Sequence, residues 1–241
     1  MARAAAVVLL VGLAACWSGQ DEPSICAARE GGLAGGLAGG AWPAVGLVRV
    51  GRELCTGTLV APRVVVSARH CVDLGTTPGE VEFLTGRQGE ELEAVGSDLL
   101  WTDGEDLIAV VLDRAPSVEP APFRTTPMAR EAIGSEVTLV GYGTTRPDAN
   151  DHGVKRSGTA SIEVVDDLTF VVEIRFDGQA APCFGDSGGP ALLDGQVAGV
   201  LSGGDPACAG RGDVYMRFDR HVELVEEAIA ASLEVETGVC R

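Results

Sequence analysis

Short apolar runs, each bounded by glycine, proline or polar residues, recur along most of this chain. Their length and their valine, isoleucine and phenylalanine content are typical of β-strands. The runs cover residues 45–50, 64–68, 107–112, 137–141, 158–165, 170–176 and 196–201. Many short strands separated by Gly and Pro turns predict an all-β barrel protein.

The hydrophobic pattern changes near the C-terminus. After Arg217 the apolar positions repeat with helical spacing, which predicts a C-terminal helix. The apolar face of this helix would carry Val222, Val225, Ala228, Ile229 and Leu233. The proline-rich residues 114–127 contain no strand-like run, so we expect them to connect two parts of the fold.

The first 15 residues form a targeting segment. Arg3 precedes an apolar run that ends at Ala15 and is too short to span a bilayer, so it predicts a signal peptide. The following L-A-A-C, residues 13–16, resembles a bacterial lipobox, which would make Cys16 the lipidated first residue of the mature chain. The alternative is an ordinary signal peptide cut nearby. Either case predicts export, as a lipoprotein anchored in a bacterial membrane (periplasmic or at the cell surface) or as a secreted protein.

Charge and composition exclude some partners. The chain has 241 residues and a formal net charge of −17. A surface with this excess of negative charge would repel nucleic acid and anionic lipid. We therefore expect no nucleic-acid partner. The sequence has no CxxC motif and no His/Cys cluster, so we predict neither a metal site nor a cofactor.

Residues 183–190, C-F-G-D-S-G-G-P, carry the clearest chemical signal. Gly185, Gly188 and Gly189 permit backbone conformations that residues with a β-carbon avoid. Such a loop can expose the Ser187 hydroxyl and turn its own N–H groups toward a common point. A nucleophilic serine needs both features, a reachable hydroxyl and donors for the developing oxyanion.

A serine hydroxyl also needs a base, and histidine has the suitable pKa. His70 ends the apolar run 64–68 and is followed at once by Cys71, so its position is well defined. His152 lies in a polar loop and His221 in the helical pattern, where we expect solvated surface roles. The base needs an orienting carboxylate, and Asp106 leads directly into an apolar run. Asp103 and Glu105 lie in the polar turn before it.

With these pieces the chain resembles the chymotrypsin/trypsin-like serine proteases, from about Trp42 to the C-terminus. The matching motifs, in order, are S-A-R-H-C (67–71), D-L-I-A-V-V-L (106–112), G-Y-G (141–143), G-D-S-G-G-P (185–190) and V-L-S-G-G (200–204). The order His, Asp, Ser is that of this family. The resemblance implies two six-stranded antiparallel barrels, residues 41–122 and 123–241. The apolar face of the C-terminal helix suggests that it packs on the second barrel.

The resemblance also implies roles for individual residues. Ser187 would attack a peptide carbonyl, His70 would take its proton and Asp106 would orient His70, with the N–H groups of Gly185 and Ser187 as the oxyanion hole. Ser202 would help to hold Asp106. The substrate backbone would pair with Ser202, Gly203 and Gly204. The implied function is a monomeric serine endopeptidase acting on proteins or peptides.

Two other functions use the same residues. An inactive relative could serve as a binding module, and Arg69, where the family usually has a small residue, favours this slightly. An esterase or acyltransferase could use the same triad.

Specificity is open at this stage. The family residue six positions before the serine is here Ala181, so the aspartate usual in trypsins is missing. Asp213 lies near the pocket floor by resemblance, where it could bind Arg or Lys of a substrate. Alternatively Asp213 turns away to the backbone and leaves an apolar pocket. Gly203 replaces a family tryptophan, which predicts weaker preference at the neighbouring subsite.

Activation is equally open. The family releases an N-terminal amine that pairs with the aspartate before the serine, here Asp186. Residues 31–40 read G-G-L-A-G-G-L-A-G-G. They are either a flexible linker, part of the segment 16–40, or they contain a cleaved terminus at Leu33 that inserts near Asp186.

The seven cysteines fit an oxidising compartment once Cys16 is set aside. By resemblance Cys55 pairs with Cys71, and Cys183 pairs with Cys208 beside the specificity pocket. Cys26 and Cys240 then remain for each other.

Overall fold

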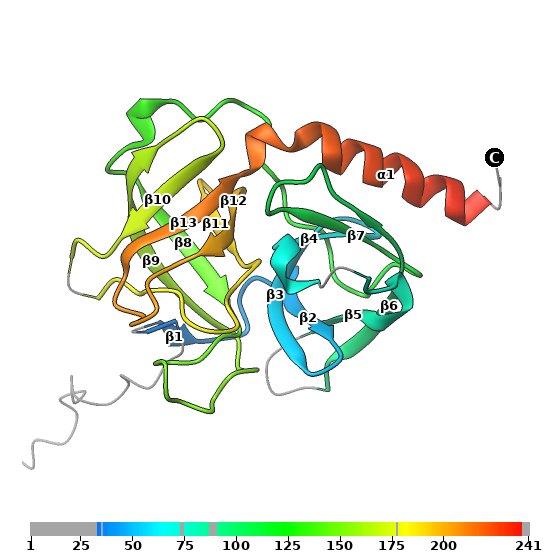
Figure 1. The fold of residues 1–241 in the computed structure, drawn as a ribbon, viewed down its shortest axis with the longest axis horizontal. Helices are drawn as coiled ribbons and strands as arrows, with labels where there is room; N and C mark the ends of the chain where they lie inside the picture. The colour runs from blue at the N-terminus through cyan, green and yellow to red at the C-terminus, as the bar shows by residue number, and fades with distance from the viewer. Residues whose placement is uncertain (1–32, 35, 73–74, 87–90, 177, 238–241) are drawn as a thin grey trace, which may run out of the picture.

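The computed structural model describes residues 33–34, 36–72, 75–86, 91–176 and 178–237. Within these ranges the chain forms two closed six-stranded antiparallel barrels that lie side by side, with one C-terminal helix (Figure 1). The predicted fold class is therefore confirmed.

The first barrel closes in the strand order β2-β3-β4-β7-β6-β5. Its strands alternate buried and partly exposed positions where one face meets the core. In β5, for example, Val81, Phe83 and Thr85 are buried while Glu82 and Leu84 are less so. The strands are β2 (Val45–Val50), β3 (Glu53–Ala61), β4 (Val64–Ser67), β5 (Val81–Thr85), β6 (Glu93–Trp101) and β7 (Ile108–Leu112).

The second barrel consists of the sheet β9-β10-β13-β12-β11-β8, which a β8–β9 pairing closes. Phe170 and Tyr215 stack in its core with ring centroids 5.4 Å apart. Its strands are β8 (Glu136–Gly141), β9 (Arg156–Val165), β10 (Thr169–Glu173), β11 (Pro190–Leu193), β12 (Gln196–Gly203) and β13 (Arg211–Arg217). The two-residue strand β1 (Leu37–Ala38) adds to the edge of β9. Single turns of 3₁₀ helix are η1 (Arg69–Cys71), η2 (Pro78–Glu80), η3 (Arg130–Ala132) and η4 (Phe218–Arg220).

The C-terminal helix α1 (Val222–Thr237) follows the second barrel in the chain but packs on the first (Figure 1). It contacts β7 and β4, and its residues Leu224, Val225 and Ala228 join the apolar cluster that contains Val64. Arg63 adds a hydrogen bond from its Nη1 to the Ser232 carbonyl (3.1 Å). The expectation that the helix packs on the second barrel is thus wrong. Periodicity identifies an apolar face but does not identify the surface that covers it.

Several predicted features of the termini lie outside the described residues. These are the signal peptide, the lipidation site Cys16, and the cysteines Cys26 and Cys240. In the part of the chain that the structure describes, no helix is long and apolar enough to cross a membrane.

Candidate functional site

His70 and Asp106 form a hydrogen-bonded pair on the first barrel. His70 lies in η1, directly after β4, and its backbone N–H donates to Asp106 Oδ1 (2.8 Å). Its ring Nδ1 lies 2.8 Å from Asp106 Oδ2, and because the carboxylate accepts, Nδ1 carries the proton. The other ring nitrogen, Nε2, is then the basic one. The predicted disulfide between Cys55 and Cys71 is present and fixes the residue next to His70.

The Asp106 carboxylate is held in its charged form. Burial opposes ionisation, but hydrogen bonds from His70 and Ser202 outweigh it and keep the pKa of Asp106 below its ordinary value. The Ser202 hydroxyl donates to Oδ2 at 2.6 Å. Since Ser202 lies on β12 of the second barrel, this bond crosses between the barrels.

The Ser187 loop depends on its glycines. Gly185 and Gly188 have φ angles of +97° and +82°, a region that favours glycine. A β-carbon on Gly188 would also lie 2.2 Å from both Ser67 Oγ and the Thr56 carbonyl oxygen, so no larger residue fits there. The sequence pattern therefore encodes the loop directly.

Thr56 of β3 anchors this loop from the first barrel. Its N–H donates to the Ser187 carbonyl (2.8 Å), and its hydroxyl donates to the Gly185 carbonyl (2.9 Å). Thr56 was not predictable from the sequence, because a threonine inside a strand gives no signal of such a contact.

The Ser187 loop borders a cleft, and two of its backbone N–H groups are unpaired in the described ranges. The N–H groups of Gly185 and Ser187 donate to no acceptor among the described residues. Ser187 is half-buried, and with His70 and Gly185 it lines a cleft of about 560 Å³. The Ser187 hydroxyl makes no hydrogen bond to His70 there; such catalytic bonds commonly form only when substrate is bound. His152 is exposed, as expected, and lines the same cleft.

Asp186, next to the serine, is buried without a cation at bonding distance in the described ranges. Its side chain accepts N–H groups of Gly143 (2.7 Å) and Cys183 (2.9 Å). Burial raises the pKa of Asp186 to about 7, despite these hydrogen bonds. A β-carbon on Gly143 would lie 2.6 Å from its carboxyl group, so the G-Y-G motif leaves space for this side chain.

The described part of segment 31–40 is docked on the second barrel. Leu33 is buried, and Ala34 forms an antiparallel bridge with Ala181 through hydrogen bonds of 2.8 and 3.1 Å. Strand β1 then pairs with β9.

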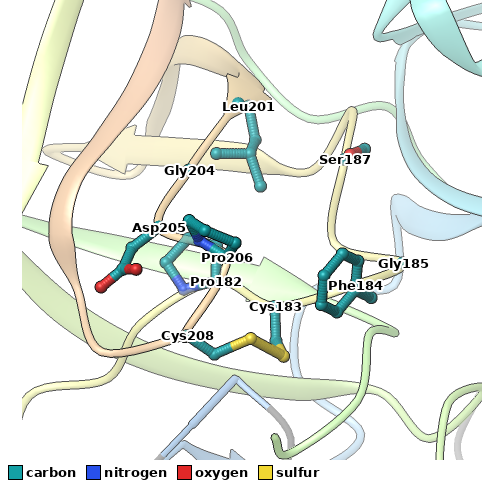
Figure 2. A pocket seen from close by; sticks show the side chains of 11 residues that line it. Pro182, Cys183, Phe184, Gly185, Ser187, Leu201, Gly204, Asp205, Pro206 and Cys208 are labelled. Carbon is teal, nitrogen blue, oxygen red and sulfur yellow. A yellow bond between two sulfur atoms is a disulfide. The ribbon is translucent and has the colours of Figure 1, made fainter. Parts of the chain in front are cut away.

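A second pocket of about 180 Å³ lies beside Ser187 (Figure 2). The predicted disulfide between Cys183 and Cys208 forms part of its wall. Most of the lining is apolar or backbone, and the acidic exception is Asp205, whose carboxylate points away from Ser187 in Figure 2. The lining comprises Pro182, Cys183, Phe184, Gly185, Ser187, Leu201, Gly203, Gly204, Asp205, Pro206 and Cys208.

Two predicted pocket residues lie behind this lining. Ala181 is fully buried, and Asp213 is 1% exposed. Asp213 Oδ1 accepts the Asp205 N–H (3.0 Å), and the carboxylate packs against Gly204, whose β-carbon would lie 2.3 Å from it. Burial, with the Asp205 and Glu173 carboxylates nearby, raises the pKa of Asp213 to about 6.

His221 contradicts its expected surface role. It is 2% exposed, and its Nδ1 lies 2.7 Å from Asp103 Oδ2. The helical pattern alone did not indicate that His221 is buried, and nothing local indicated a partner 118 positions away.

The described ranges contain no group of three His, Cys, Asp or Glu side chains that could hold a metal ion. His70, Gly185 and Ser187 line the cleft, and Asp106 accepts the hydrogen bond of His70 Nδ1.

Comparisons with known proteins agree with this geometry. A family model described as Trypsin matches residues 37–225. A curated protein named "Trypsin" from Saccharopolyspora erythraea is 26% identical over 204 residues, covering 75% of this chain and 89% of the relative. "Inactive snake venom serine proteinase 13" from Crotalus adamanteus is 27% identical over 217 residues, covering 78% and 82%. The solved structure of human heparin binding protein superimposes with a TM-score of 0.69 at 18% identity, covering 81% of this chain and 96% of that one. With the family model spanning most of its length, the chain belongs to the trypsin family of serine proteases.

Proposed function

We propose that this chain is an active serine endopeptidase in which Ser187 is the nucleophile, His70 the general base and Asp106 the orienting carboxylate. The observation that carries the proposal is that His70, hydrogen-bonded to Asp106, lines one cleft together with Ser187 and Gly185, whose N–H groups have no acceptor in the described ranges. A binding module would have no need for this arrangement.

The reaction is acyl transfer in two steps. His70 Nε2 takes the proton of the Ser187 hydroxyl as the oxygen attacks the carbonyl carbon, and the new imidazolium is stabilised by Asp106. The N–H groups of Gly185 and Ser187 bind the oxyanion, and the loss of one such donor typically costs about 3 kcal/mol of barrier. His70 gives its proton to the leaving amine, and water then releases the acyl group by the same route.

The substrate backbone would bind along residues 202–204. Ser202 and Gly203 end β12 and Gly204 follows it, and Gly203 and Gly204 line the pocket beside Ser187. An extended peptide can pair there as an added strand. A β-carbon on Gly203 would meet no atom within 4 Å, so the neighbouring subsite is open on this side. We therefore expect weak preference beyond the first residue.

The pocket favours a small or medium-sized apolar side chain before the cleaved bond. Its volume of about 180 Å³ is limited, and its walls are mainly proline, leucine and the disulfide. Asp213 cannot reach a substrate cation without displacement of Gly204, because it is buried behind that residue. Of the two possibilities left by the sequence, the geometry supports the apolar pocket.

Export and lipidation belong to the same proposal. The two disulfides suit an oxidising compartment, and we propose that Cys16 is the lipidated residue of a monomeric enzyme. Detergent phase separation of the expressed protein, compared with Cys16→Ser, tests this directly. N-terminal sequencing of the active protein tests whether cleavage at Leu33 is needed.

The function itself is tested by labelling with a fluorophosphonate and by a panel of peptide substrates. We expect labelling that Ser187→Ala abolishes, and cleavage after alanine, valine or leucine in preference to arginine or lysine. Absence of labelling would indicate that the chain is an inactive relative. One similar venom protein is named an inactive serine proteinase. Turnover of esters without peptides would identify an esterase.

A further inference from the structure

The turn that precedes Asp106 is held by a residue from the other end of the chain. This turn belongs to the connection between β6 and β7 on the first barrel, residues 102–107, which includes Asp106 itself. His221 lies between η4 and α1, after the last strand of the second barrel. Its Nδ1 lies 2.7 Å from Asp103 Oδ2, and the carboxylate is the acceptor.

Asp103 connects His221 to the backbone next to Asp106, because its carboxylate accepts a hydrogen bond from each. Its second oxygen, Oδ1, accepts the N–H of Glu105 (3.1 Å). The Glu105 carbonyl in turn accepts a hydrogen bond from Arg69 Nε (2.9 Å), the neighbour of His70. The path from His221 to Asp106 therefore consists of two hydrogen bonds and one peptide link.

The Asp103–His221 hydrogen bond holds a buried ring against the turn. The His221 ring is 2% exposed, and its Nε2 is buried with no hydrogen-bond partner in the described ranges, so Asp103 is the single group that orients it. Burial opposes the charge on Asp103, but hydrogen bonds from His221 and the Glu105 N–H outweigh it and lower the pKa of Asp103. A second contact nearby joins Trp101 Nε1 to Glu227 Oε2 on α1 (3.0 Å).

The position of this pair matters because the reacting groups are divided between the barrels. His70 and Asp106 belong to the first barrel, whereas Ser187 belongs to the second. A displacement of about 1 Å in such a site can cost up to about 100-fold in rate. The hydrogen bond from His221 to Asp103 joins the end of the second barrel to the Asp106 turn. It thereby limits displacement of Asp106 and His70 relative to Ser187.

We propose that His221 is a positioning residue for peptide hydrolysis, which acts through Asp103 on the Asp106 carboxylate and thereby on His70. The proposal rests on the proposed protease function. It assigns a role to a histidine that does not touch the substrate or the reacting atoms.

The test compares two substitutions of nearly equal size in the full-length protein. His221→Asn places an amide nitrogen where Nδ1 was and can still donate to Asp103, whereas His221→Leu cannot. We expect His221→Leu to lower kcat about tenfold with little change in KM, because the reacting groups are misplaced while the pocket is intact. The pKa seen in the pH profile of kcat/KM should fall, because a misaligned Asp106 stabilises the imidazolium less. His221→Asn should recover most of both effects.

Because a substitution at the buried His221 could disturb folding, a second pair of variants changes partly exposed residues instead. Asp103→Ala removes the partner from the partly exposed side, and Asp98→Ala is its control. Asp98 also pairs with a buried side chain, that of Arg63, and both aspartate side chains are 37% exposed, but within the described ranges Asp98 makes no hydrogen bond to residues 102–106. Asp103→Ala should lower kcat and shift the profile, and Asp98→Ala should affect thermal stability alone.

Each outcome decides between the alternatives. Equal kcat and equal pH profiles for His221→Leu and His221→Asn, or for Asp103→Ala and Asp98→Ala, would overturn the positioning role and leave the protease function standing. If the unaltered protein neither hydrolyses peptides nor reacts with a fluorophosphonate, the protease function fails and the positioning role fails with it.

Discussion

Asp213 offers a quantitative test of the pocket, because its carboxylate is buried and incompletely paired. Oδ1 accepts one N–H, from Asp205, while Oδ2 is buried without a partner in the described part of the chain. The pKa of Asp213 rises from 3.8 to about 6 in the folded protein. Between about pH 4 and pH 6 the folded state therefore holds a proton that the unfolded state has lost. The contribution of Asp213 to stability falls as pH rises through this window, and it stays low above it.

The size of the effect follows from the pKa. A rise of about two units corresponds to about 3 kcal/mol at pH 8, since each unit is about 1.4 kcal/mol. Asp213→Asn removes this cost and keeps the Oδ1 acceptor, but it buries an amide N–H whose missing partner costs about 1 kcal/mol. We therefore expect Asp213→Asn to be more stable at pH 8 by about 2 kcal/mol, or about 4–8 °C in Tm for a chain of this size. At pH 4.5, where Asp213 is largely protonated, the difference should nearly vanish.

The assay is thermal unfolding at pH 4.5, 6 and 8, with every protein in a Ser187→Ala background to prevent self-digestion. Asp148→Asn serves as the control, because that carboxylate is 80% exposed and its removal should shift Tm little at any pH. If Asp213→Asn gains the same stability at all three pH values, or loses stability at pH 8, the description of Asp213 as a costly buried carboxylate is refuted.

Three further variants test the site and the disulfide beside it. Gly143→Ala should abolish fluorophosphonate labelling, because its β-carbon would lie 2.6 Å from the Asp186 carboxyl group; normal labelling would show that the loop can adapt. Ser202→Ala should lower kcat several-fold with KM nearly unchanged, since it removes the 2.6 Å hydrogen bond to Asp106; a change confined to KM would indicate a substrate contact instead. Replacing both Cys55 and Cys71 by serine should cost about 3 kcal/mol, the chain-entropy value for a loop of this length, visible as a lower Tm without reductant; an unchanged Tm would contradict this.

The nucleophile loop was predictable because its determinants are local. Positive φ at Gly185 and Gly188 and the close approach of Gly188 to Thr56 demand glycine at fixed distances from Ser187. The same holds for His70, fixed by the end of a strand and by a neighbouring cysteine. Asp106 could be chosen over Asp103 because it leads into a fully buried strand.

Other features were not predictable because their partners are distant in sequence. The apolar positions of α1 indicate a helix, but they do not show that the first barrel covers it. Strands such as β3 and β13 escaped the pattern because glycine, cysteine and charged residues interrupt their apolar positions. The Asp213 carboxylate is oriented by a hydrogen bond from the Asp205 N–H, and no sequence motif predicts that contact.

The contacts that complete the site all cross from one barrel to the other. Thr56 of the first barrel binds the Ser187 loop, Ser202 of the second barrel binds Asp106, and His221 binds Asp103. Neither barrel alone could therefore present the site, because each holds groups that the other must orient. Each barrel has an apolar cluster of its own, and a third cluster joins the two, for example Val64 of β4 with Val200 of β12. Substitution of the polar residues Thr56, Ser202 or His221 should therefore reduce catalysis before either barrel unfolds, because it leaves the shared apolar cluster in place.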